Sequence, residues 1–112
     1  MTVSIYSQSA SPLGSSTYRF NGVAAPAQFI PTLTFEAKAN GSGTNNWVRV
    51  ESTYPLITVV DGVTTQTGAF RMKSEFTALQ NVIADSERAR LFDEHVAFLT
   101  AQKANILAGK VR

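Results

Sequence analysis

The chain has 112 residues, of which 44% are hydrophobic, so it can form one folded domain but not a second core. It contains no cysteine, which excludes disulfides, thiolate catalysis and cysteine-ligated metal sites. Its net charge of +2 excludes binding to nucleic acid through a polybasic tail. The sequence has no apolar run of the ~20 residues that cross a membrane, and its first residues lack a signal-peptide pattern. We therefore expect it to fold in a cytoplasm, without a membrane partner.

The first part of the chain, residues 1–24, predicts a β-hairpin. A short alternating segment precedes residues 11–14, whose serine, proline and glycine are typical of a turn. Residues 16–20 supply the returning strand. Pro26 and Pro31 then bound a linker, because proline is not accommodated in the interior of a helix.

The middle of the chain, residues 31–78, predicts an antiparallel meander. Polar and apolar residues alternate with a period of two, as in strands that bury one face. The alternating segments are 32–38, 46–52 and 64–77. Pro55 is expected to end the second of these strands. A short β-branched run then leads to Asp61 and Gly62, a dipeptide that favours a tight turn.

The last part of the chain, residues 85–108, predicts helix. Asp85 is a favourable N-cap, and Glu87 in the first turn suits the helix dipole. Apolar residues then recur at helical spacing, and Gly109 is expected to end the helical region. The recurring apolar residues are Leu91, Phe92, Val96, Phe98 and Leu99. Strands followed by a helix indicate a single α+β domain over residues 1–112.

This combination of elements predicts that the chain does not act as a monomer. About five strands at ~4.8 Å spacing make a sheet about 24 Å wide, whereas one helix covers ~10 Å. The predicted apolar face consists of Leu33, Phe35, Val48, Val50, Phe70, Met72 and Phe76. Two chains that pair edge to edge would join their sheets and cover this face with the helices of both chains. Alternatively, the N-terminal hairpin folds back over the sheet.

No constellation in the sequence predicts an enzyme, a cofactor or a metal site. His95 is the single histidine, and one histidine on a helix supplies one ligand with no second cluster opposite it. We expect it at the border of the buried helix stripe. The serines lack a nucleophile elbow, and the glycines do not form a phosphate-binding loop before a helix.

The opposite, polar face of the predicted sheet carries cations, carboxylates and one aromatic ring. Its residues are Thr34, Glu36, Lys38, Trp47, Arg49, Glu51, Thr53, Arg71, Lys73 and Glu75. Arginine and lysine bind phosphates, glutamate and threonine bond to base edges, and tryptophan stacks on unpaired bases. The alternative is a solvated face with cross-strand ion pairs that contribute little. From the residues alone, the solvated face is the favoured interpretation, and an exposed ring at Trp47 is the one feature that argues against it.

The order and spacing of these segments resemble those of the coat proteins of the levivirus group of single-stranded RNA bacteriophages. The segments are TLTFEAKA, NWVRVESTYP, the turn DGV, AFRMKSEFT and DSERARLFDEHVAFL, within residues 32–99. The resemblance implies an N-terminal β-hairpin, a five-stranded antiparallel sheet and C-terminal helices. It also implies an interlocked homodimer with a continuous sheet, and dimers that assemble into an icosahedral shell around RNA.

The resemblance also implies positions for the site. The RNA-contacting residues fall on Thr34, Glu36, Lys38, Trp47, Arg49, Glu51, Arg71, Lys73 and Glu75. Trp47 replaces a small polar residue of the best-studied relatives, and Arg71 replaces their stacking tyrosine. Pro55, Asp61 and Gly62 belong to a loop that contacts neighbouring dimers around the symmetry axes.

The partners implied by the resemblance are a second copy of the chain, a single-stranded RNA genome or RNA hairpin, and the phage maturation protein. The location is the virion, after assembly in the bacterial host cytoplasm. The alternative is a cellular homodimeric RNA-binding or regulatory domain that forms no shell. Electron microscopy of the expressed protein separates the two, because only a coat protein forms uniform particles.

Overall fold

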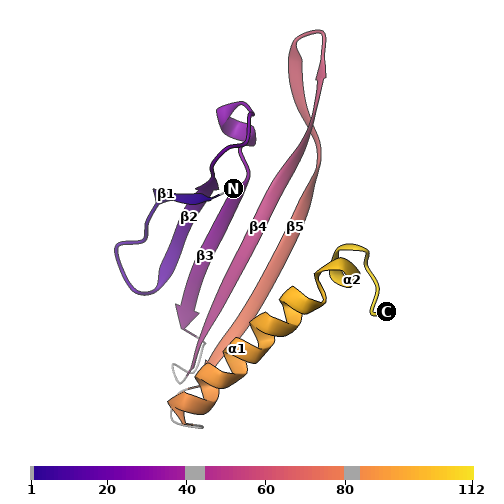
Figure 1. The fold of residues 1–112 in the computed structure, drawn as a ribbon. Helices are drawn as coiled ribbons and strands as arrows, with labels where there is room; N and C mark the ends of the chain where they lie inside the picture. The colour runs from indigo at the N-terminus through magenta and orange to yellow at the C-terminus, as the bar shows by residue number, and fades with distance from the viewer. Residues whose placement is uncertain (1, 40–44, 80–83) are drawn as a thin grey trace. The chain divides into compact units, whose positions relative to one another are not determined.

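The computed structural model describes residues 2–39, 45–79 and 84–112 (Figure 1). The chain divides into two units, Met1–Ala78 and Leu79–Arg112. The first unit is built from strands and the second from helices.

The first unit is a five-stranded sheet in which each strand lies beside the next one along the chain. The strands are β1 (Val3–Ser7), β2 (Gly14–Phe20), β3 (Thr32–Ala39), β4 (Asn45–Val60) and β5 (Val63–Leu79). A short 3-10 helix, Ala27–Phe29, lies in the proline-bounded linker between β2 and β3. The antiparallel meander is therefore confirmed. The N-terminal hairpin supplies two of its five strands, because β2 pairs with β3, and it does not fold back over the sheet.

The register of β3 against its neighbours separates the two faces of the sheet. Thr34 lies opposite Thr17 and Glu51, and Glu36 lies opposite Ser15 and Arg49. On the other face, Phe35 lies opposite Ser16 and Val50. Because opposite residues of an antiparallel pair project to the same side, polar positions gather on one face and apolar positions on the other.

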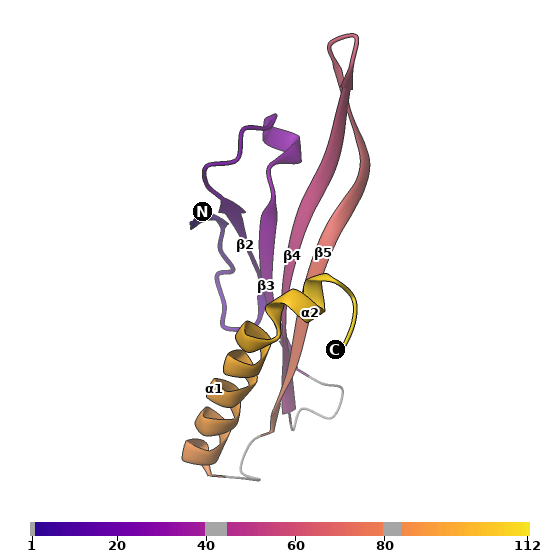
Figure 2. The same cartoon turned by 45° about the vertical axis from the view of Figure 1, so that its right-hand side comes forward.

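The prediction that Pro55 ends a strand is wrong, since β4 continues through Pro55 to Val60. The pairing of β4 with β3 stops at Thr53, and beyond it β4 has only β5 beside it. Figures 1 and 2 show these two strands running on past the rest of the sheet. Proline is tolerated there because a strand at an edge has positions with no ladder hydrogen bond to lose. We call this two-stranded segment, residues 54–69, the ribbon.

The tip of the ribbon is the predicted tight turn. Asp61 and Gly62 both have positive φ, 52° and 76°, as a type I′ turn requires. The hydroxyl of Thr67 donates a hydrogen bond to the carbonyl of Leu56 across the ribbon, at 3.2 Å. The segment of the predicted inter-dimer loop, with Pro55, Asp61 and Gly62, is therefore a paired hairpin with a two-residue turn.

The second unit contains α1 (Asp85–Ala101) and α2 (Lys103–Leu107), within the predicted helical region. The N-cap is Ala84 rather than the predicted Asp85, which is the first helical residue. Asp85 still stabilises this end, because its carboxylate lies in the first turn and pairs with Arg88 at 3.3 Å. Gly109, with φ of 71°, follows the last helix, as expected for a helix C-terminus.

A single chain has no apolar core among the residues that the structure describes. No alanine, valine, isoleucine, leucine, methionine or aromatic side chain of these residues is buried, whereas Pro31 is fully buried. Phe35, Phe70 and Met72 of the apolar face are 45%, 48% and 51% exposed. Neither described helix buries a residue, and neither is long and apolar enough to span a membrane.

Candidate nucleic-acid interface

The polar face of the sheet brings the predicted site residues together. Strand β3 contributes Thr34, Glu36 and Lys38, which lie opposite Glu51, Arg49 and Trp47 of β4. Strand β5 contributes Arg71, Lys73 and Glu75 at alternate positions. Glu75 joins this group directly, through its contact with Arg49. The alternation in the sequence therefore places these nine residues on one side of three neighbouring strands.

Carboxylates already hold two of the cations on this face. The Arg49 Nε lies 3.1 Å from Glu75 Oε1, and its Nη1 lies 3.9 Å from Glu36 Oε1. The Lys73 Nζ lies 3.5 Å from the same Glu75 oxygen. Exposed ion pairs of this kind contribute only ~0–1 kcal/mol each. A phosphate can therefore compete for Arg49 and Lys73, but it must displace Glu75 to do so.

Trp47 lies between two cations rather than standing alone. The Arg49 Cζ is 4.9 Å from the centre of the indole ring, and the Lys38 Nζ is 5.6 Å from it. The Trp47 side chain is half-buried, although the sequence suggested an exposed ring. We call Lys38, Trp47 and Arg49 the Trp47 site. It combines an aromatic surface with the positive charge that a nucleotide requires.

A shallow depression of about 160 Å³ adjoins this site, lined by Thr34, Glu36, Arg49 and Glu51. Two carboxylates, a hydroxyl and a guanidinium together accept and donate hydrogen bonds within a small area. Carboxylates accept hydrogen bonds from the amino groups of bases. Among the described residues, Glu51 makes no ion pair, so its carboxylate is available for such a contact.

Tyr6 and Arg19 form a further pair on the same face, which was not predicted from the sequence. Arg19 of β2 lies opposite Thr32, which lies opposite Thr53 of β4, and these three residues share the polar side. The Arg19 Cζ is 3.7 Å from the centre of the Tyr6 ring. The alternation of Thr17 and Arg19 with apolar Tyr18 was a signal that could have located Arg19. The position of Tyr6 depends on a bulge in β1, which alternation does not predict.

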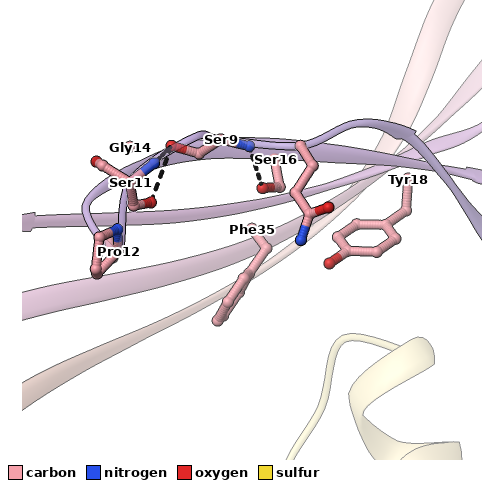
Figure 3. A pocket seen from close by; sticks show the side chains of 9 residues that line it. Ser9, Ser11, Pro12, Gly14, Ser16, Tyr18 and Phe35 are labelled. Carbon is pink, nitrogen blue, oxygen red and sulfur yellow. Dashed lines mark hydrogen bonds between the residues drawn. The ribbon is translucent and has the colours of Figure 1, made fainter.

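The apolar side carries a second depression, also of about 160 Å³, under the turn between β1 and β2 (Figure 3). The Ser9 amide donates a hydrogen bond to Ser16 Oγ at 2.9 Å, and Ser9 Oγ donates one to the carbonyl oxygen of Ser11 at 3.1 Å. A Cβ added at Gly14 would collide with Ser9 Oγ. The serines that line this depression hold the turn together through these hydrogen bonds.

The remaining predicted positions belong to other segments of the chain. Pro55, Asp61 and Gly62 are in the ribbon, where Val59, Val60 and Val63 are each more than 60% exposed. His95 lies within α1. In the part of the chain that the structure describes, histidines and acidic residues form no group able to hold a metal ion.

Neither a protein-family model nor a curated protein matches the chain, but solved structures match it closely. A virus-like particle of bacteriophage AC has 44% identity and a TM-score of 0.91, and the match covers 99% of this chain and 97% of that one. This chain belongs to the coat protein family of levi-like RNA bacteriophages. It is a structural capsid protein, and the alternative of a cellular regulatory domain is not favoured.

Two further matches show how far the coat protein fold extends. A virus-like particle of bacteriophage NT-391 has 25% identity and a TM-score of 0.79, with coverage of 97% of this chain and 92% of that one. A virus-like particle of Beihai levi-like virus 21 has 20% identity and a TM-score of 0.64, with coverage of 92% and 76%. The second match shows the fold alone. The similarity to the particles of bacteriophages AC and NT-391 indicates a structural role for the coat protein.

Proposed function

We propose that this coat protein forms an interlocked dimer, that dimers assemble into an icosahedral shell, and that the polar face binds single-stranded RNA inside it. One observation supports the proposal above all. Although 44% of the residues of the chain are hydrophobic, none of its alanine, valine, isoleucine, leucine, methionine or aromatic side chains is buried among the described residues. Such a chain needs further copies of itself to bury them. The similarity to virus-like particles of 44% and 25% identity supports a shell as the form these copies take.

The dimer contact is proposed at β5 and on the apolar face. Strand β5 has 17 residues and is the last strand of the sheet, so its outer edge carries hydrogen-bonding groups that a second β5 can pair. Phe92, Val96 and Leu99 on α1 are 53%, 43% and 39% exposed. Burying one such side chain completely contributes on the order of 1.5–3 kcal/mol. Helices that cross onto the joined sheet would therefore stabilise the dimer considerably.

The contact between dimers is proposed at the ribbon. The ribbon reaches past the five-stranded part of the sheet and ends in the turn of Asp61 and Gly62. Its exposed valines, Val59, Val60 and Val63, supply apolar surface close to that turn. A projecting, hydrogen-bonded hairpin can reach a neighbouring dimer without disturbing the dimer core. Pro55 keeps one edge of it from pairing freely with other strands.

The RNA contact is proposed on the polar face. With Arg19, this face carries five cations and three carboxylates per chain, an excess of two positive charges. An excess of this size does not neutralise a genome, so we propose contacts to short elements of the RNA. Arg49 and Lys73 would bind phosphates, and Trp47 would stack on an unpaired base. Thr34, Glu36 and Glu51 would then contact base edges.

Because the chain belongs to this coat protein family, we propose that the RNA is the phage genome or a hairpin within it. The coat protein would assemble in the cytoplasm of the bacterial host, reside in the virion capsid and contact the phage maturation protein there.

Electron microscopy of the full chain expressed in bacteria tests the proposed function. We expect uniform particles that sediment together with RNA, which nuclease leaves intact until the shell is opened. Homogeneous free dimers under all assembly conditions would contradict the shell. Particles that contain no nucleic acid would leave the shell in place and contradict the RNA contact.

A further inference from the structure

We propose that Tyr6 and Arg19 form a second RNA-contact site, which binds an unpaired nucleotide at the β1 end of the polar face. We call this pair the Tyr6 site. The inference rests on the proposed RNA binding and extends it to a part of the sheet that the Trp47 site does not include. Four observations carry it: the face on which the pair lies, the free charge of Arg19, the exposure of Tyr6, and the surface between the two sites.

The strand register puts Arg19 on the same face as the Trp47 site. Arg19 lies opposite Thr32 in the β2–β3 pair, and Thr32 lies opposite Thr53 in the β3–β4 pair. Strand β1 bulges between Ile5 and Ser7, and a bulge re-aims the side chain of the extra residue. The Tyr6 ring consequently meets the Arg19 guanidinium, with 3.7 Å between Cζ and the ring centre.

The charge of Arg19 is more available than the charge of Arg49. Arg49 contacts the carboxylates of Glu36 and Glu75, whereas Arg19 makes no ion pair with any described residue. Stacking on a ring occupies one flat side of a guanidinium and leaves its in-plane N–H donors for a phosphate or a base edge. Arg19 is therefore a cation that a phosphate can reach without displacing an acid.

Tyr6 stays 60% exposed even with Arg19 against it. All five residues of β1 are exposed, and β1 is the first strand of the sheet, so no further strand of this unit lies beyond it. Unpaired bases stack on aromatic rings and on arginine planes. The pair offers both surfaces at once, as the Trp47 site does at the other end of the face.

The surface between the two sites suits a single RNA strand. Thr32 lies beside Arg19 of the Tyr6 site, and Lys38 belongs to the Trp47 site. The two residues are six positions apart along β3, a distance of about 20 Å. Between these positions the register places the hydroxyl groups of Ser15, Thr17 and Thr34, and the shallow depression, whose lining includes Glu36 and Glu51 as well as Arg49. One strand of several nucleotides can therefore contact both sites, and its affinity should depend on its length.

Photo-crosslinking of the wild-type full chain, purified with the RNA that it carries, tests the site. After ultraviolet irradiation and digestion, mass spectrometry should find nucleotide adducts at Tyr6 and at Trp47. Tyr18 is the internal control, because it lies opposite Leu33 on the apolar face of the same hairpin. Adducts at Trp47 without Tyr6, or at Tyr18 as strongly as at Tyr6, would overturn the Tyr6 site and leave the proposed function standing. Adducts at none of them, or no bound RNA, would overturn both.

Affinity for unstructured oligouridylates of increasing length gives a second measurement. For the wild type, affinity should rise once the strand reaches both sites. Tyr6→Leu should lower the affinity for long strands at least about fivefold and leave the affinity for the shortest strands unchanged. Tyr6→Phe should retain it, since a phenyl ring still stacks. Arg19→Gln should in addition lower the salt slope by about 0.7 units, whereas Arg19→Lys should keep that slope.

Tyr18→Phe is the matched control for these variants and should behave as the wild type at every length. A purely structural role, in which the pair only holds β1 against β2, would change the melting temperature of Tyr6→Leu and Arg19→Gln without changing any affinity. That result would overturn the Tyr6 site.

Discussion

The two faces of the sheet differ in whether a single chain satisfies their side chains. On the polar face, Arg49, Lys73 and Glu75 satisfy one another through contacts of 3.1–3.5 Å within one chain. On the apolar face, Phe70 and Met72 remain about half exposed, and nothing in the described single chain buries them. Ion pairs need only a neighbouring strand, whereas a wide apolar surface needs an object of similar width. The polar face thus satisfies these charges within one chain, whereas burial of the apolar face is proposed to come from assembly.

The neighbours Phe70 and Arg71 give the largest expected contrast, because adjacent strand residues project to opposite faces. Phe70→Asp would place a carboxylate in the proposed dimer core, where burying an unpaired charge costs several kcal/mol. We expect no dimers and no particles by size-exclusion chromatography and electron microscopy. Arg71→Asp should still give particles, with less RNA. Equal loss of particles in both variants would contradict the assignment of the two faces.

A variant in α1 tests the same proposed dimer core. Phe92→Ala should destabilise the assembled protein by about 3–5 kcal/mol, because it removes a large side chain from a packed core. Denaturant titration of dimers measures this loss. Arg90→Ala is the control, since Arg90 makes an exposed ion pair with Glu87 at 3.7 Å that contributes little. Unchanged stability of Phe92→Ala would place Phe92 outside the core.

The polar face is tested by RNA titration at several salt concentrations, with dimers kept from assembling. Trp47→Ala should cost about 1–3 kcal/mol of binding and leave the salt slope nearly unchanged, because stacking releases no counterions. Arg49→Ala should lower the affinity and reduce the slope by somewhat under one unit. If neither variant changes RNA binding, the polar face is only a solvated surface with ion pairs.

The proposed contact between dimers at the ribbon predicts that a change there affects shell formation but not dimer formation. Gly62 has φ of 76°, so Gly62→Ala should strain the turn by roughly 1–2 kcal/mol. We expect intact dimers but fewer or misshapen particles. Gly68→Ala in the same ribbon is the control, since its added Cβ would make ordinary contact with Leu56 at 3.7 Å. Loss of dimers in Gly62→Ala would contradict an inter-dimer role.

Glu75→Gln gives the smallest expected effect and a change in the opposite direction. The amide no longer neutralises Arg49 and Lys73, which become more available to phosphates. RNA affinity should rise by under 1 kcal/mol, and the salt slope should steepen by up to about 0.7 units. Glu87→Gln, which changes the same charge on α1, controls for net charge. A weaker affinity of Glu75→Gln would show that Glu75 itself contacts the RNA.

The local pattern of residues was enough to predict the two faces of the central strands and the turn at Asp61 and Gly62. A strand has a side-chain period of two, so the alternation through Thr34, Glu36 and Lys38 leaves only one assignment of faces. A two-residue turn with positive φ at both positions similarly favours aspartate followed by glycine. These properties depend on residues close together in the chain.

The contacts between residues on different strands depend on the tertiary structure. Arg49 pairs with Glu75, 26 residues further along the chain, because the strand pairing brings them together. Pro55 lies inside a strand because β3 ends its pairing at Thr32 and leaves β4 an open edge. Tyr6 reaches Arg19 because β1 bulges by one residue. Each of these depends on the register of neighbouring strands, which a local pattern does not contain.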